Sequence, residues 1–198
     1  MDDDNIIFLT QEKNIRADAQ RNRQKLLDAA RNLFDCQGIE QVTMSAIAKK
    51  AQVGKGTLYR HFADKAVLCH ALLDTAMRDL QQRTLDCIRQ TDDPAEALRW
   101  FLHEGVQYTV QNADLLMEAA NQGNENMLHH PAHIWCRQTI RGLLAQMQVA
   151  GDADYIADTL YIMLDVQTIR YQRTTQGYSP TRIVQGLHMT LARLTDGV

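Results

Sequence analysis

Apolar residues recur along most of this chain at the three- and four-residue spacing of amphipathic helices. The clearest stripe lies within residues 21–37 and is formed by Leu26, Leu27, Ala30, Leu33 and Phe34. Sustained two-residue alternation, the pattern of half-buried strands, is hard to find, and only three prolines and ten glycines interrupt the 198 residues. The pattern therefore predicts an all-α fold.

Capping residues and helix breakers divide this pattern into about nine helices. Thr43 and Asp64 stand at N-cap positions, Pro94 suits a first helical turn, and glycines follow several of the apolar stripes. Residues 1–20 are expected to form a polar, acidic arm ahead of the first helix. The expected helices cover residues 21–37, 43–51, 55–62, 65–90, 94–112, 113–122, 131–150, 152–176 and 180–195.

Residues 43–62 contain two short expected helices separated by about four residues. Apolar side chains at Ile47, Val53 and Leu58 are placed to pack where the two helices cross. This spacing is typical of a helix-turn-helix, whose second helix lies in the major groove of DNA. Exposed positions of that helix can bond phosphates or base edges, and a glycine amide near its N-terminus favours a phosphate. The candidate residues are Lys55, Gly56, Thr57, Tyr59, Arg60 and His61.

The distribution of charge supports this interpretation. The chain carries a net charge of −3, yet residues 13–65 hold 11 Lys and Arg against 5 Asp and Glu. Residues 1–12 and 66–198 are both acidic, with net charges of −4 and −5. A basic segment joined to an acidic one is a sign of polyanion binding, with chance clustering on solvated faces as the alternative.

The stretch from Thr43 to Leu68 reads I-A-x-x-A-x-V-x-x-G-T-L-Y-x-H-F-x-x-K-x-x-L from Ile47 onward and resembles the DNA-binding domain of TetR-family transcriptional repressors. The resemblance covers roughly residues 21–70. It implies an all-α protein with a DNA-binding domain at 21–65 and a ligand-binding and dimerisation domain at 66–198. It further implies phosphate contacts from Thr43, Tyr59 and Lys65, and base or phosphate contacts from Lys55, Thr57, Arg60 and His61.

The sequence departs from the family pattern at two positions in the turn. Gln52 stands where family members usually have glycine, and a side chain at positive φ costs on the order of 1 kcal/mol. Gly54 replaces the usual Ser or Thr cap, at a cost of only about a few tenths of a kcal/mol. Both departures bear on the geometry of the turn and on base readout.

Aromatic, methionine and polar residues of the second half are candidates for lining a small-molecule pocket, which the resemblance implies. Any one of them is more often plain core, and acidic residues such as Glu104, Glu118 and Asp165 face either a ligand or solvent. The predicted ligand-binding residues are Trp100, His103, Glu104, Tyr108, Met117, Met127, Trp135, Tyr161 and Asp165.

A cluster around Pro131 offers metal sensing as an alternative, because His133 and Cys136 are i, i+3 neighbours on the expected helix. Its members are His129, His130, His133 and Cys136. A solvated or hydrogen-bonded helix entrance explains the same residues, and we predict no metal or other cofactor.

Broad apolar stripes on the last two expected helices predict a homodimer, because the resemblance implies that these helices pack against their copies. An intrachain core is the alternative for the same residues. On the first of the two helices the stripe consists of Ile156, Leu160, Met163, Leu164 and Ile169.

Composition narrows the classes of protein to which the chain can belong. There is no apolar stretch of membrane-spanning length and no signal-peptide pattern, and the four dispersed cysteines fit a reducing cytoplasm. We therefore predict a cytoplasmic bacterial repressor, not an enzyme, that binds a palindromic DNA operator as a dimer and is released by a small-molecule inducer. An all-α enzyme that uses the C-terminal residues and a DNA-binding activator are the alternatives.

Overall fold

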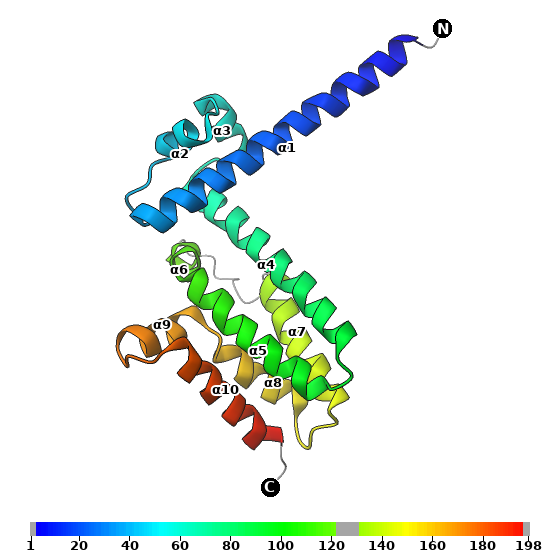
Figure 1. Cartoon of the computed structure of the whole chain (residues 1–198), viewed down its shortest axis with the longest axis vertical. Coiled ribbons are helices and arrows are strands. Elements are labelled where there is room, and N and C mark those ends of the chain that lie inside the picture. The colour runs from blue at the N-terminus through cyan, green and yellow to red at the C-terminus, as the bar shows by residue number, and fades with distance from the viewer. Residues whose placement is uncertain (1–2, 122–130, 196–198) are drawn as a thin grey trace. The chain divides into compact units, whose positions relative to one another are not determined.

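The computed structural model describes residues 3–121 and 131–195, and every regular element in those ranges is a helix (Figure 1). The all-α prediction is confirmed, with ten helices in place of the expected nine. They are α1 (Asp3–Gln37), α2 (Met44–Ala51), α3 (Lys55–His61), α4 (Lys65–Gln90), α5 (Pro94–Gln111), α6 (Ala113–Asn121), α7 (Pro131–Gln146), α8 (Ala153–Ile162), α9 (Val166–Thr174) and α10 (Pro180–Thr195).

The chain separates into two compact units, Met1–Leu72 and Leu73–Val198. The separation falls inside α4, whereas the sequence placed a domain boundary at the start of that helix. Within the described residues, none of the helices combines the length and the apolar character needed to cross a bilayer.

The N-terminal unit is built on α1, which packs against both α2 and α3. Helix α2 begins after Thr43, whose hydroxyl accepts the Ala46 N–H at 3.2 Å. It ends at Gln52, whose φ of 55° places a non-glycine residue in the left-handed region, as the sequence predicted. Gly54 then precedes α3 without a side-chain cap. The buried side chains of this unit include Leu26, Leu27, Phe34, Ile47, Leu58 and Phe62.

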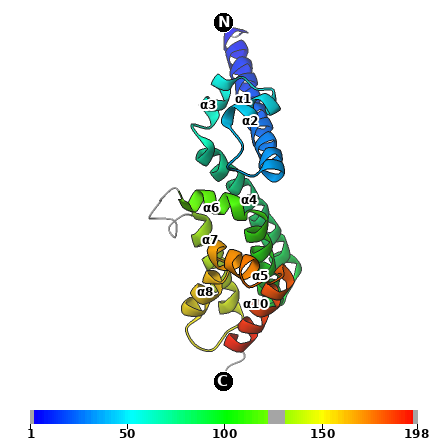
Figure 2. The ribbon, with the colours of Figure 1, turned by 90° about the vertical axis from the view of Figure 1, so that its left-hand side faces the viewer.

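Helix α1 differs from the prediction because it begins at Asp3 and not near residue 21. The expected arm is therefore the N-terminal part of α1, which extends past α2 and α3 in both views of the ribbon (Figure 2). The physical reason is that neither proline nor glycine occurs in residues 1–37, so no residue there breaks the helix.

The C-terminal unit is assembled around α5, which packs against α6, α7, α9 and α10. Asp93 caps α5 by accepting the Ala95 N–H at 2.8 Å, and Pro94 occupies the first turn as predicted. Buried apolar positions along α5 meet buried positions of α7, α8, α9 and α10 in one cluster. Among its members are Leu98, Phe101, Leu102, Val106, Ile140, Leu144, Leu160, Ile169, Leu187 and Leu191.

The single helix expected over residues 152–176 is two helices, which accounts for the extra element. Helix α8 ends at Ile162, and Asp165 caps the start of α9 by accepting the N–H groups of Gln167 and Thr168. Leu164, between the helices, is buried, and the Thr109 hydroxyl donates to its carbonyl oxygen at 3.1 Å. Because residues 152–176 contain no proline or glycine, the break between α8 and α9 is fixed by packing against α5.

Candidate functional site

Helix α3 presents a polar face whose direction is set by its buried residues. Leu58 and, directly after the helix, Phe62 lie almost completely buried, so the remaining side chains of α3 face outward. Lys55, Tyr59 and Arg60 are exposed, while Thr57 and His61 are half-buried. No acidic residue occurs in α3, and the last turn of the preceding α2 adds the exposed Lys49 and Lys50. The local field on this face is therefore positive.

Two of the predicted contact residues on α3 interact with each other. The Arg60 Nη2 donates to the Thr57 Oγ1 at 2.9 Å, one helical turn away. Thr43 lies at the entrance to α2, where its hydroxyl oxygen accepts the Ala46 N–H and its own O–H can still donate to a phosphate. Gly56 is exposed with open space beside its Cα.

Lys65 has a structural contact that the sequence did not suggest. Its ammonium group donates to the carbonyl oxygens of Ile39 at 2.7 Å, Val42 at 3.3 Å and Glu40 at 3.5 Å. These three acceptors match the three donors of an ammonium group, so the side chain fastens the start of α4 to the loop that precedes α2. This arrangement gives the lysine a role that needs no DNA phosphate.

Arg23 is a further residue that the sequence did not single out. Its guanidinium carbon lies 5.3 Å from the centre of the Phe62 ring, a cation–π distance. The contact braces α1 against the residue that ends α3. No sequence signal separates Arg23 from its basic neighbours, because the partner lies 39 residues later in the chain.

In the C-terminal unit, the predicted ligand residue Tyr161 is bonded to His133. The Tyr161 hydroxyl and His133 Nδ1 form a hydrogen bond, and the two rings meet edge to face with centres 5.8 Å apart. Burial raises the pKa of Tyr161, and the nearby Cys136, Asp165 and Tyr108 act in the same direction. Burial also raises the pKa of the Cys136 thiol to about 12, so this group is neutral at physiological pH.

Aromatic candidates lie at the edge of the same core. Trp135 meets Phe101 edge to face with ring centres 5.7 Å apart, and Trp100 is partly buried against the core cluster. Tyr108 and Met117 are half-buried, whereas His103 is exposed and lies 3.4 Å from the Gln107 amide.

The acidic candidates have partners within the chain. Glu104 pairs with Arg83 of α4, which also pairs with Asp79 at 2.9 Å, and the hydrogen bond to Glu104 is the main cause of a raised Arg83 pKa. Asp165 caps α9. Both carboxylates are therefore already neutralised or hydrogen-bonded by the protein.

Three of the sequence candidates lie outside the described residues: Met127, His129 and His130. In the part of the chain that the structure describes, no three His, Cys, Asp or Glu side chains gather as a metal site. His133 and Cys136, the described members of the predicted cluster, have the interactions given above.

The apolar stripe expected at a subunit interface is intrachain core for four of its five members, Ile156, Leu160, Leu164 and Ile169. The alternative interpretation therefore holds for these residues, and Met163 is partly buried against the same core. A different face of α8 and α10 is exposed. Tyr155, Met189 and Ile162 have exposed fractions of 72%, 64% and 63%, the highest among the described large apolar side chains.

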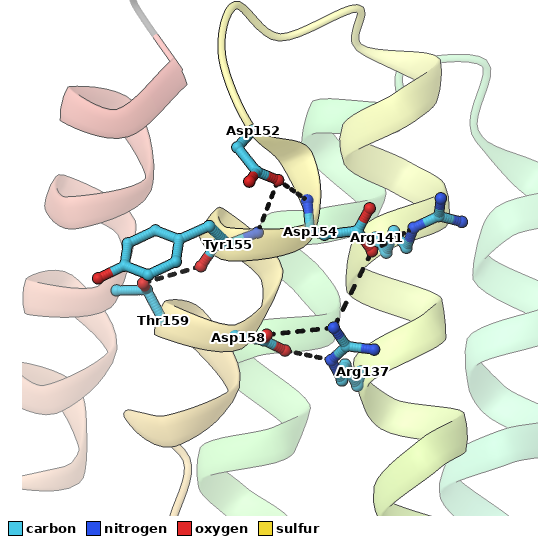
Figure 3. Close-up of polar contacts among 7 residues, drawn as sticks. All are labelled: Arg137, Arg141, Asp152, Asp154, Tyr155, Asp158 and Thr159. Atoms are coloured by element: carbon cyan, nitrogen blue, oxygen red, sulfur yellow. Dashed lines mark hydrogen bonds and ion pairs between the residues drawn. The ribbon is translucent and has the colours of Figure 1, made fainter.

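The two sides of α8 have different chemistry (Figure 3). On one side Asp158 pairs with Arg137 of α7, and Asp154 accepts from Arg141 at 2.6 Å. Tyr155 and Thr159 project from the other side, away from these arginines. The ion pairs attach α8 to α7 and leave the apolar side of α8 uncovered.

Comparison with known proteins relates this geometry to a family. Residues 26–72 match the family model of bacterial regulatory proteins, tetR family. An HTH-type transcriptional regulator of Staphylococcus aureus (strain USA300) is 38% identical over 112 residues, which cover 54% of this chain and 59% of the relative. The chain thus spans less than two thirds of the length of such curated relatives.

Solved structures extend the likeness to most of the chain. A TetR-family transcriptional regulator from Pectobacterium atrosepticum covers 92% of this chain with a TM-score of 0.73 at 20% identity, over 98% of its own length. A gamma-butyrolactone receptor (ArpA-like protein) covers 89% with a TM-score of 0.55 at 27% identity, over 98% of its own length. Residues 26–72 thus carry the DNA-binding domain of the tetR family of bacterial regulatory proteins, and the helix-turn-helix and the shared fold support a TetR-family transcriptional regulator.

Proposed function

We propose that this protein is a DNA-binding transcriptional repressor that acts as a homodimer and is released by a small molecule. The observation that carries the proposal is the exposed, acid-free face of α3, held in place by Leu58 and Phe62 within the segment that matches the family. Phosphate contacts from this face and from Lys49 and Lys50 supply affinity, while base contacts from α3 supply sequence preference.

Dimerisation uses the uncovered side of α8 and α10. Tyr155 and Ile162 lie on one face of α8, Met189 lies on α10, and the two helices pack together. A two-fold pairing of this surface covers the most exposed apolar side chains of the described chain, and such isologous interfaces are the commonest in homodimers. Two copies of α3 then read half-sites about 34–36 Å apart on a palindromic operator.

The ligand binds in the C-terminal unit beside the Tyr161–His133 pair. Support comes from the half-buried aromatic and polar side chains gathered there and from the structural likeness to a receptor for gamma-butyrolactone. Because Glu104 and Asp165 are already engaged, the site is better suited to a neutral or hydrogen-bonding molecule than to a cation.

Selection of genomic DNA fragments on the full-length protein tests this function, followed by footprinting and salt titration of the best fragment. We expect one footprint with dyad symmetry, a steep loss of affinity with salt, and repression of a reporter promoter that carries the site. Salt-independent retention, or retention without any enriched sequence, would contradict the proposal. Genes beside the enriched sites then identify compounds to test for release of the DNA.

A further inference from the structure

Arg60 differs from its neighbours on α3 in the donors that it offers. The helix contains seven residues, and Arg60 is the one with a rigid, planar pair of parallel N–H donors. Lys55 carries a compact point charge, and Thr57 and Tyr59 each carry a single hydroxyl. In the major groove, guanine presents two acceptors side by side, N7 and O6. The donor geometry of Arg60 therefore matches guanine better than any other base.

The contact with Thr57 sets the direction of the Arg60 side chain. Arg60 lies in the last turn of α3, and its Nη2 reaches the Thr57 Oγ1 at 2.9 Å in the turn before. Side chains of a helix lean toward its N-terminus, so this bond holds the guanidinium alongside the earlier turn. In a helix-turn-helix, residues in the N-terminal part of the second helix meet the base edges.

The remaining donors of Arg60 stay available for a base. A guanidinium has five N–H groups, and the Thr57 hydroxyl uses one of them. Within residues 16–120 and 131–195, no carboxylate pairs with Arg60, and the side chain is exposed. The hydrogen bond to Thr57 also restricts the rotamers of the Arg60 side chain before binding, which lowers the entropy lost when DNA binds.

We propose that Arg60 reads one guanine in each operator half-site and that Thr57 is the positioning residue for its guanidinium. The inference rests on the proposed DNA-binding function and adds to it the base that the dimer recognises.

Duplexes that carry the selected site with 7-deazaguanine at one guanine at a time test this directly, because that base lacks the N7 acceptor. Wild-type protein is expected to lose about 5- to 150-fold in affinity at one guanine per half-site. Arg60→Ala should show no further loss at that guanine, and Arg60→Gln should move the preference toward adenine. Thr57→Val should weaken discrimination at the same position by about fivefold, with an unchanged salt slope.

Helix α4 offers a matched control, since Arg78 Nη2 donates to the Thr75 Oγ1 at 3.3 Å with the same i, i+3 spacing. Arg78→Ala and Thr75→Val should leave the sensitivity to 7-deazaguanine as it is in the wild type. Circular dichroism verifies that each variant is folded.

Two results would overturn the inference and leave the proposed function standing. In one, Arg60→Ala keeps the wild-type sensitivity at every guanine, or the wild type shows none. In the other, Arg60→Ala weakens all sequences equally and lowers the salt slope by about one, the behaviour of a phosphate contact. Failure of the wild type to enrich any sequence would overturn the proposed function together with this inference.

Discussion

The two units of this protein use their polar side chains differently. On α3 the predicted contact residues face outward, and the Arg60–Thr57 pair is an interaction within the exposed face itself. In the C-terminal unit the corresponding candidates are bonded across elements, as in the pairs Arg83–Glu104 and His133–Tyr161. The proposed DNA-binding surface lies on one short helix and the adjoining end of α2, whereas an internal site depends on how several helices assemble. This difference explains why local spacing identifies the first kind of site more readily.

The two units also have separate hydrophobic cores. Substitution of one leucine in each core tests whether the units behave separately. Leu58→Ala in α3 removes a fully buried side chain of the N-terminal unit and should cost about 2–5 kcal/mol of unfolding free energy. DNA binding should be lost while the dimer survives in sedimentation, because the proposed dimer surface lies in the other unit. Leu102→Ala in α5 is the matched change in the C-terminal unit. Loss of the dimer with Leu58→Ala would show that the two units do not behave separately.

Substitutions on the uncovered side of α8 and α10 are expected to have the next largest effect. Tyr155→Asp combined with Met189→Asp places four carboxylates in the proposed dimer interface and should weaken dimerisation about a hundredfold or more. Sedimentation over a range of protein concentrations measures this change. Tyr171→Asp on α9 is the control, because Tyr171 is 55% exposed but lies outside that surface. An unchanged dimer in the double variant would place the interface elsewhere.

A substitution at Lys65 tests whether this lysine stabilises the fold or contacts DNA. Lys65→Met removes the hydrogen bonds to three carbonyl oxygens and should lower the unfolding free energy by about 1 kcal/mol, a modest value because the group is only half-buried. We expect an unchanged salt slope of DNA binding, whereas Lys55→Ala should lower the slope by about one without affecting stability. Unchanged stability and a lower salt slope in Lys65→Met would assign Lys65 the phosphate contact that the family resemblance implies.

Alanine substitutions at two helical glycines of the C-terminal unit are expected to have the smallest and most local effects on stability. A Cβ at Gly105 would lie 2.9 Å from the Leu164 Cδ1, so Gly105→Ala should cost about 1 kcal/mol despite the better helix propensity of alanine. Gly142 of α7 has open space beside it, and Gly142→Ala should stabilise the protein by about 0.5–1 kcal/mol. Thermal unfolding measures both. A stabilising Gly105→Ala would show that Leu164 does not press on α5.

Much of the DNA-binding unit could be predicted from the sequence because its signals are local. The Thr43 cap, the left-handed turn at Gln52 and the apolar positions Ile47 and Leu58 all lie within twenty residues, and the structure confirms each of them. The start of α1 differs from the prediction because the charge and polarity of residues 1–20 indicate an arm, although neither proline nor glycine occurs there. Whether the exposed residues contact DNA as proposed stays a prediction.

What the sequence determined by itself is the helical fold, the helix-turn-helix and the resemblance of its DNA-binding segment to a family, since these depend on spacing and capping along a continuous stretch of chain. Only the tertiary structure decided which apolar stripe of α8 is core and which side is uncovered, because both sides carry large apolar residues. It also assigned Lys65 to backbone carbonyls, Glu104 to Arg83 and Asp165 to a cap at a helix break fixed by α5. For Lys65, Glu104 and the α5 contact at this break, the partner lies some 20 to 55 residues away, a distance over which sequence spacing carries no geometric information.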